Sequence, residues 1–268
     1  SSADATGSTA SELNTIDAAT SVLVDAGAIT AIEGTFDEIK TLYSSTGVTG
    51  LGNEAITASD TGSIAASTLL TVAQANTSGT VDASNAGTIT GTAEQIINSY
   101  ADSTITEASN VALTVNSGTA SLTQARSLDG LTTGVVTATI ADTAVSDLLG
   151  SSPLLDANSN NAFTITIGTD DASVSAANLN TLDGLTTVAI NAGNVTTITS
   201  STLDSINTLY ASSGFSGLGN EAITASDTGS IAASTITTVA AANSSGTLNV
   251  SAAGTITGTA AELSLIHI

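Results

Sequence analysis

Short apolar stripes recur along the chain, each introduced by a small or hydroxyl-bearing residue. The segments resemble Thr-Ala-x-x-Leu and recur at spacings of 23 to 31 residues, about 28 on average. Aliphatic residues usually stand four and seven positions after the leading residue, and such positions face the same way on an α-helix. Ten short helical segments are therefore predicted, led by Thr9, Thr35, Ala65, Thr92, Ser121, Ala144, Ser175, Thr202, Ala232 and Thr259.

Some of these segments, such as those led by Thr9 and Thr35, also carry a signal for the start of a helix. Thr9 and Thr35 are each followed three residues later by a glutamate, Glu12 and Glu38. A hydroxyl residue and a carboxylate at this spacing form a capping box, in which each side chain accepts a hydrogen bond from the other residue's backbone. The sequence therefore predicts helix starts at these two threonines.

Between the helical segments, the pattern changes to short alternating runs rich in β-branched residues. Residues 80–83 and 88–90 are one such pair of runs, separated by small turn residues at 84–87. A unit of helix, strand, turn and strand can bury its apolar side only against neighbouring copies. We therefore predict a β-solenoid, similar to a parallel β-helix, with a short helical segment in each coil of about 28 residues. A leucine-rich-repeat-like horseshoe is the alternative, because residues 185–190 followed by Asn194 and Val195 imitate that pattern.

A longer repeat is superimposed on these units. Residues 50–68 recur without a change at 217–235, which is 167 positions later, and the likeness extends over residues 35–93 and 202–260. We interpret residues 1–268 as a single continuous repeat array, a fragment of a longer protein. The pattern is disturbed once, at residues 150–161, where the only proline, Pro153, predicts an exposed loop.

The net charge of the chain limits the classes of partner that it can bind. The formal net charge is −22, and Lys40 and Arg126 are the only permanent cations. Nucleic-acid binding requires cationic side chains against phosphate, so this class is excluded, and anionic membrane surfaces are disfavoured. A strongly acidic surface suits salty water, where screening weakens self-repulsion. We therefore predict an extracellular or cell-surface protein. It has no cysteine for a disulfide framework and no apolar run long enough to span a membrane.

The sequence offers little that predicts catalysis. His267 is the sole histidine, and no G-x-S-x-G motif is present. An active site needs one constellation of side chains that occurs once, whereas this chain repeats itself. We predict that the protein is not an enzyme, with no catalytic residue, no cofactor-binding residue and no assigned metal ligand.

Calcium is the one ion that the composition suggests. Carboxylate, amide and hydroxyl oxygens are the ligands that Ca²⁺ prefers. Neither an EF-hand loop nor the G-G-x-G-x-D nonapeptide is present, so a solvated acidic surface is the competing interpretation. The candidates are Asn53, Glu54, Asp60, their copies Asn220, Glu221 and Asp227, and Asp156, Asp170 and Asp171.

Two further patterns have a functional and a structural interpretation. Paired threonines recur as Thr-x-Thr and resemble the flat threonine ladders of ice-binding solenoids, although threonine also suits any exposed strand face. Tyr43, Tyr100 and Tyr210 stand at the same position of three helical segments. They could stack on sugars or cover the edge of the apolar stripe. The paired threonines are Thr88/Thr90, Thr104/Thr106, Thr137/Thr139, Thr164/Thr166, Thr197/Thr199 and Thr255/Thr257.

Three repeated motifs carry a resemblance to known proteins: Thr-Gly-Thr-Ala-Glu at 90–94, Leu-Asp-Gly-Leu-Thr-Thr at 128–133 and 182–187, and Gly-Leu-Gly-Asn-Glu-Ala at 50–55 and 217–222. The chain resembles the repeat regions of giant cell-surface and adhesin-like proteins of marine bacteria and cyanobacteria. The resemblance implies a structural or adhesive, non-catalytic segment of a secreted or cell-surface protein. The alternatives are a calcium-stiffened adhesin segment and an ice- or glycan-binding repetitive face. The expected partners are neighbouring repeats of the same long chain, with cell-surface polysaccharide or other cells as further candidates.

Overall fold

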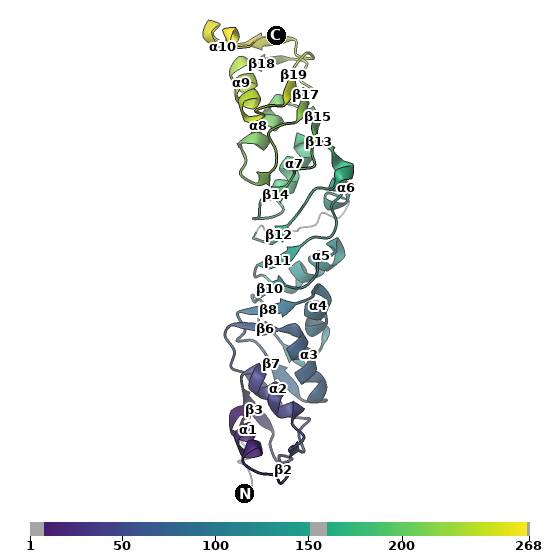
Figure 1. Cartoon of the computed structure of the whole chain (residues 1–268), viewed down its shortest axis with the longest axis vertical. Coiled ribbons are helices and arrows are strands. Elements are labelled where there is room, and N and C mark those ends of the chain that lie inside the picture. The colour runs from purple at the N-terminus through teal and green to yellow at the C-terminus, as the bar shows by residue number, and fades with distance from the viewer. Residues whose placement is uncertain (1–7, 151–159, 267–268) are drawn as a thin grey trace. The chain divides into compact units, whose positions relative to one another are not determined.

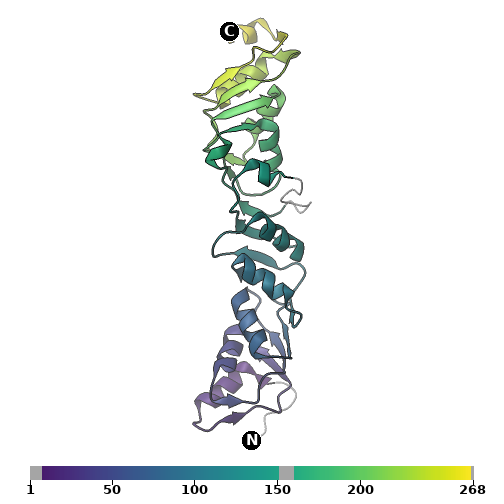
Figure 2. The same ribbon diagram turned by 90° about the vertical axis from the view of Figure 1, so that its right-hand side faces the viewer.

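The computed structural model describes residues 8–150 and 160–266, and the chain divides into two compact units, residues 1–138 and 139–268. Figures 1 and 2 show the ribbon from two sides. In the described residues each unit contains short helices that alternate with short strands, and each unit is described separately below.

The helices begin where the apolar stripes predict them. Every one of the ten predicted leading residues is the N-cap of an α-helix, from Thr9 for α1 to Thr259 for α10. The predicted capping boxes at Thr9 and Thr35 are confirmed. The described helices are α1 (Ala10–Ala18), α2 (Phe36–Ser44), α3 (Ala66–Ala75), α4 (Ala93–Ala101), α5 (Leu122–Leu131), α6 (Val145–Leu148), α7 (Ala176–Asp183), α8 (Leu203–Ala211), α9 (Ala233–Ala242) and α10 (Ala260–Ser264), with a 3₁₀ turn η1 at Thr169–Asp171.

The strands of residues 1–138 pair in parallel and form separate small sheets. One sheet joins β1, β3, β5, β7 and β9, a second contains β6, β8, β10 and β11, and β2 pairs with β4. Consecutive helices from α1 to α5 contact one another. The strands are β1 (Ser8–Thr9), β2 (Val24–Asp25), β3 (Ala31–Gly34), β4 (Val48–Thr49), β5 (Ala55–Ala58), β6 (Ser63–Ala65), β7 (Thr80–Asp82), β8 (Thr88–Gly91), β9 (Ile105–Thr106), β10 (Ala112–Val115) and β11 (Val136–Thr139).

Residues 139–268 repeat this arrangement. A parallel sheet joins β13, β15, β17 and β19, while β14 pairs with β16 and β18 with β20. Helices α7, α8 and α9 contact one another in sequence. The strands are β12 (Ala162–Thr164), β13 (Ser173–Ser175), β14 (Ile190–Asn191), β15 (Thr197–Ser201), β16 (Phe215–Ser216), β17 (Ala222–Ala225), β18 (Ser230–Ala232), β19 (Thr247–Asn249) and β20 (Thr255–Thr257).

The predicted fold class is wrong. The described chain has several small parallel sheets with alternating helices, an α/β-type arrangement, and not the single β-solenoid with a helix in every 28-residue coil. The leucine-rich-repeat-like horseshoe fails for the same reason, since it requires one continuous parallel sheet.

Two different periods in the same chain explain this error. Helix starts are 23 to 31 residues apart, whereas paired strand residues are only 23 to 25 apart, as in Ala31 with Ala55 and Ala55 with Thr80. The strand that precedes a helix therefore changes sheet along the chain. Strand β3 directly precedes α2 and pairs with β5, but β6 precedes α3 and pairs with β8. The helical period alone could not reveal the shorter strand period.

The core consists of aliphatic rows that cross the strands. Parallel register places Ile32 beside Ile56, Ile56 beside Val81, and Val81 beside Ile105, and all four are buried. The residues that stand four positions after each leading residue complete this core, and in α1 to α9 all of them are buried. Leu263 of α10 is the exception, with 41% exposure. Each repeat thus covers the apolar side chains of the one before it.

Some sequence-based predictions fall outside the described residues. Pro153, Asp156 and His267 lie in the segments 151–159 and 267–268. Among the helices that are described, none has the length and apolarity needed to cross a bilayer.

Candidate functional site

The most polar buried site is a cluster of three side chains that come from consecutive repeats. Tyr43 lies on α2, Glu54 directly precedes β5, and Asn76 is the C-cap of α3. We call these three residues the Tyr–Glu–Asn cluster of the first unit. Glu54 is 2% exposed and Asn76 is fully buried. Burying a carboxylate and an amide is costly unless their hydrogen-bonding groups are satisfied, so their partners determine what the cluster can do.

Three donors of the protein bond to the Glu54 carboxylate. The Tyr43 hydroxyl donates to Glu54 Oε2 at 2.5 Å, and the backbone N–H groups of Gly52 and Asn53 donate to the same oxygen at 2.9 and 3.0 Å. A carboxylate accepts bonds and donates none, so these three donors match it well. The side chain therefore fixes the turn that precedes β5.

Asn76 bonds to the backbone of Glu54 in the way that a neighbouring strand would. Asn76 Oδ1 accepts from the Glu54 N–H at 2.9 Å, and Asn76 Nδ2 donates to the Glu54 carbonyl at 2.8 Å. The Tyr43 hydroxyl also lies 3.1 Å from Asn76 Oδ1. One asparagine thus satisfies two buried backbone groups of the previous repeat, a role that an apolar residue cannot fill.

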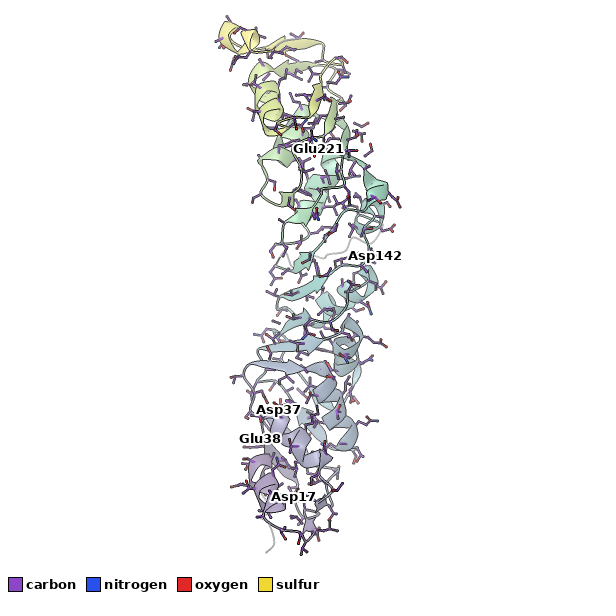
Figure 3. The ribbon with its side chains drawn as sticks, viewed as in Figure 1. Asp17, Asp37, Glu38, Asp142 and Glu221 are labelled. Atoms are coloured by element: carbon purple, nitrogen blue, oxygen red, sulfur yellow. The ribbon has the colours of Figure 1, made fainter. Side chains whose placement is uncertain are left out.

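The second unit contains the same cluster in Tyr210, Glu221 and Asn243. Glu221 N–H donates to Asn243 Oδ1 at 2.9 Å, Asn243 Nδ2 donates to the Glu221 carbonyl at 2.8 Å, and the Tyr210 hydroxyl donates to Glu221. Figure 3 labels Glu221 in its place within this unit. The two clusters have the same partners because their sequences repeat at an interval of 167 residues.

Burial raises the pKa of both tyrosines far above the ordinary value of a phenol. The hydrogen bond to Glu54 or Glu221, and the charge of that carboxylate, raise the tyrosine pKa further. Each hydroxyl therefore stays protonated and remains a donor at neutral pH. A catalytic base must be within reach of a substrate proton. Glu54 and Glu221 are instead 2% and 1% exposed and already bonded internally, so the geometry stabilises the turn and offers no reacting group.

Tight packing surrounds the cluster at one glycine. A Cβ atom on Gly79 would lie 2.3 Å from Asn76 Nδ2 and 2.3 Å from the Glu54 carbonyl oxygen, and Gly246 has the same surroundings in the second unit. Any side chain there would displace the asparagine or the backbone it holds. Glycine at this position is therefore required by close approach.

A second polar contact between repeats involves an aspartate and a serine. The Ser45 hydroxyl donates to Asp17 Oδ2 at 2.6 Å and accepts from the Gly47 N–H at 2.9 Å. Ser212, Asp183 and Gly214 repeat this arrangement with the same distances in the second unit. These contacts also join one repeat to the next, so they add to the same structural pattern.

In a third polar contact between repeats, threonine takes the place of the asparagine. The Thr132 hydroxyl donates to the Val111 carbonyl at 2.6 Å, and the Thr186 hydroxyl donates to the Phe163 carbonyl at 2.7 Å. Both threonines belong to the repeated Leu-Asp-Gly-Leu-Thr-Thr motif. Their hydroxyls again satisfy a backbone group of the previous repeat.

Three of the proposed calcium ligands accept hydrogen bonds from backbone N–H groups. Asp60 accepts from the Phe36 N–H at 2.9 Å, and Asp227 accepts from the Leu203 N–H at 2.7 Å. Asp171 accepts from the Val145 N–H at 2.8 Å. In each case a carboxylate caps the first N–H of the helix in the preceding repeat, where negative charge is favourable.

The remaining candidates do not come together as a metal site. Asn53 Oδ1 accepts from the Ser78 hydroxyl at 2.9 Å, and Asn220 accepts from Ser245 in the same way. Asp170 lies in the 3₁₀ turn η1. Within the described ranges no group of three or more histidine, aspartate or glutamate side chains is placed to hold a metal ion.

The threonine pattern forms only a short row. Parallel register aligns Thr90, Thr114 and Thr137 on β8, β10 and β11, but the position before Thr90 in this row is Ala65. In the second unit Thr197 pairs with Ala222, which again interrupts the row. A flat, continuous threonine face is therefore not formed by these strands.

The two asparagines are not among the residues predicted from the sequence. Asn76 and Asn243 follow the buried glutamates by 22 residues in both copies, within the repeated segments 75–79 and 242–246. That conserved interval inside the chain was the available signal. The sequence pattern suggests that the tyrosines stack on sugars or cover the helix stripe, and that the glutamates bind calcium or lie on a solvated surface, so it does not predict the contact between them.

No protein-family model, curated protein or solved structure matches this chain.

Proposed function

We propose that the chain is a structural, adhesive repeat segment of a secreted or cell-surface protein, and that it has no catalytic activity. It transmits load and presents equivalent weak contact surfaces along a longer array. Neighbouring repeats of the same chain are its main partners, and cell-surface polysaccharide or other cells are the candidate external partners.

One observation carries this proposal: the buried Tyr–Glu–Asn clusters join consecutive repeats, and the same contacts occur in both units. The Tyr43–Glu54–Asn76 and Tyr210–Glu221–Asn243 clusters share their donors, acceptors and spacing. Selection for a single reactive site would favour one unrepeated constellation, whereas selection for a scaffold favours copies of a stable corner.

The charge of the chain agrees with an exterior location. A net charge of −22 makes separate chains repel one another in dilute solution, and salty water screens this repulsion. Binding by such a surface would be spread over many equivalent positions and strengthened by their number.

The experiment changes the number of 167-residue blocks without creating a new junction. Deleting residues 51–217 joins Gly50 to Leu218 and restores the natural sequence at the seam, because residues 50–68 and 217–235 are identical. The deleted chain, the parent chain and chains with one or two extra blocks inserted at the same seam are displayed on a host cell that does not adhere by itself. Attachment to glycan-coated surfaces and to other cells is then measured under flow.

We expect attachment to rise by degrees with block number and to show no dependence on any single side chain. A point substitution that abolishes attachment while the circular dichroism and melting curve stay unchanged would contradict the proposal, since it would reveal a discrete site. Attachment that is identical at every block number would contradict it as well.

A further inference from the structure

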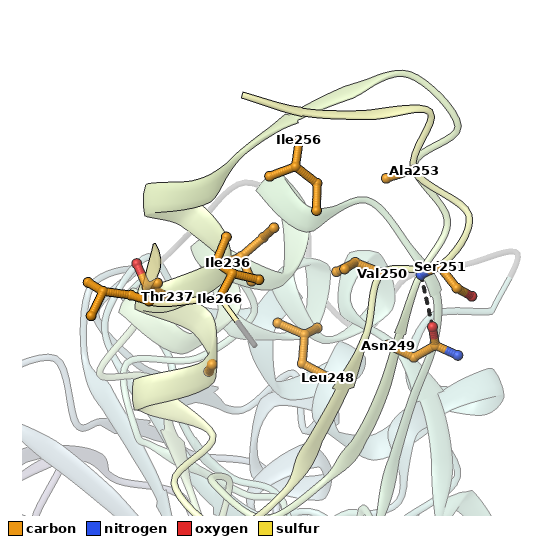
Figure 4. Close-up of a pocket in the computed structure, with 11 residues that line it drawn as sticks. Ile236, Thr237, Leu248, Asn249, Val250, Ser251, Ala253, Ile256 and Ile266 are labelled. Carbon is orange, nitrogen blue, oxygen red and sulfur yellow. Dashed lines mark hydrogen bonds between the residues drawn. The ribbon is translucent and has the colours of Figure 1, made fainter. Parts of the chain in front are cut away.

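The C-terminal end of the second unit carries an apolar groove of about 680 Å³. Figure 4 shows Leu248, Val250 and Ile256 facing this open space, with Ile236 of α9 beside them. Among the described residues, Leu248 and Ile256 are the last members of the aliphatic rows of this unit, because β19 and β20 are the final strands of their sheets. In this part of the chain the groove is therefore an uncovered face of the core.

The first unit contains a covered twin of the same surface. Residues 167 positions earlier have the same elements around them, and there Val81 and Ile89 are fully buried, whereas Leu248 and Ile256 are half-buried. The difference is clearest on the following helix, where Ile96 is 0% exposed and its counterpart Leu263 is 41% exposed. The first unit therefore shows the equivalent surface in its covered state.

The occupant in the first unit is the repeat that follows. Ile105 of β9 pairs with Val81, and Ala112 and Leu113 of β10 pair with Thr88 and Ile89. Helix α4 packs on both α3 and α5. The surface is therefore covered by strands and a helix of the chain, with an aliphatic residue meeting each row.

The backbone favours the same kind of occupant in the second unit. In the first unit Val81 N–H donates to the Thr104 carbonyl at 2.8 Å, and Ala83 N–H donates to the Thr106 carbonyl at 2.8 Å. Of the equivalent residues, Leu248 lies in β19 and Val250 directly follows it, and β19 pairs only with β17 in the described chain. A lipid or other apolar small molecule could fill the groove but could not supply two carbonyls at strand spacing.

We propose that this groove, together with the open edges of β19 and β20, is a docking site for one further repeat with the chemistry of residues 97–131. The occupant adds a parallel strand that carries an isoleucine beside Leu248 and a second strand with a leucine beside Ile256. The inference rests on the proposed function, since it specifies how one repeat of the structural array binds the next.

A second copy of this chain fits the site less well. Strand β1, whose second edge is open in the described chain, has two residues and leads directly into α1. In the covered twin, the strand beside Val81 is instead followed by a loop and by β10. Both copies would also carry the charge of −22.

The test replaces residues 264–268 of the full chain with residues 97–131 of the same chain, which follow Ile96, the counterpart of Leu263. The matched control carries the same extension with Asp at the positions taken from Ile105 and Leu113. Amide hydrogen exchange is measured at Leu248 and Val250, and the fluorescence of an apolar dye reports the groove. We expect exchange at both amides to slow at least about tenfold with the extension but not with the control. Dye binding should fall in parallel.

Two results would overturn the proposal. One is an extension that is itself protected from exchange while the Leu248 and Val250 amides and the dye signal stay as in the parent chain. The other is a parent chain whose sedimentation shows a concentration-dependent dimer that the extension abolishes, since a second copy would then be the occupant. Either result leaves the dependence of attachment on block number intact, so the failure of this inference and that of the proposed function are distinguishable.

Discussion

Tyr43 and Tyr100 occupy the same position on two helices of the first unit, yet their hydroxyl groups have different surroundings. Burial raises the pKa of both tyrosines, and a neighbouring glutamate raises it further. Tyr43 donates to Glu54, whereas the Tyr100 hydroxyl is buried without a hydrogen-bond partner among the described residues. An unpaired buried hydroxyl costs free energy, so the two sites differ in stability although they share a tyrosine.

The difference lies in the residues that follow. Eleven positions after Tyr43 stands Glu54, but eleven positions after Tyr100 stands Val111. Thr132 replaces the asparagine and donates to the Val111 carbonyl, which preserves the bond between repeats. Threonine and valine thus keep the backbone contact and leave the tyrosine without an acceptor. A repeated residue becomes a repeated site only when its partners repeat as well.

The largest effect is expected from Asn76→Ala. The substitution leaves the buried Glu54 N–H without its partner and removes one of the two donors to the Glu54 carbonyl, so it should lower the free energy of unfolding by about 3 kcal/mol. Urea unfolding measures the change. Asn53→Ala is the matched control, because Asn53 is exposed and makes its one side-chain bond to Ser78. If both variants lose the same stability, the cluster does not hold the repeats together as argued.

A somewhat smaller loss, about 2 kcal/mol, should follow Gly79→Ala. The added methyl group would lie 2.3 Å from Asn76 Nδ2 and must push the asparagine away from Glu54. Gly62→Ala provides the comparison, because a Cβ there meets no atom within 4 Å. Thermal melting of the two variants should separate them clearly. Equal melting temperatures would mean that the close approach at Gly79 relaxes without cost.

Removing single hydroxyl groups tests the contrast directly. Tyr43→Phe removes a donor from Glu54 and should cost about 1 to 2 kcal/mol. Tyr100→Phe removes a hydroxyl that has no partner in the described structure, so its effect should be about zero or slightly stabilising. Chemical denaturation of both variants gives the answer. A loss at Tyr100 as large as that at Tyr43 would show that its hydroxyl has an acceptor after all.

The sequence predicted the helices well because their signals are local. The hydroxyl or small residue at each start, the glutamate three residues later and the aliphatic residue at the fourth position all lie within one turn or two. Thr9, Thr35 and Thr259 accordingly lead helices where predicted. The location of these starts requires no knowledge of the neighbouring repeats.

Strand pairing could not be predicted from the same signals. The strands have two to five residues, and their partners lie 23 to 25 residues away. Register depends on which aliphatic residues meet across repeats, such as Ile56 and Val81, and a period of 28 obscured that match. The Tyr–Glu–Asn cluster could not be predicted for a related reason. The glutamate and the asparagine follow the tyrosine by 11 and 33 residues, and the three side chains meet only in the folded chain.

The smallest effect concerns Glu107, the carboxyl group that acts on Tyr100. Burial raises the pKa of Glu107 to about 7, and the charge of Asp102 adds to the rise against opposing hydrogen bonds. A carboxyl pKa raised above 4.5 means that the folded protein holds the proton more tightly than the unfolded chain. The associated stability is therefore complete below about pH 4.5 and is lost as the pH rises towards and through about 7.

Glu107→Gln should remove this pH dependence, because glutamine stays neutral. From pH 5 to pH 8 the variant should become more stable relative to the parent chain, by on the order of 1 kcal/mol in the free energy of unfolding. Melting temperatures of the two proteins, measured across this pH range, report the change. Taking the difference cancels the titration of the other carboxyl groups. Asn53→Ala, measured at the same pH values, shows how far an exposed polar side chain changes the profile. A difference that stays constant from pH 5 to pH 8 would mean that Glu107 titrates like an exposed carboxyl, and the two tyrosine sites would then differ only in their hydrogen bonds.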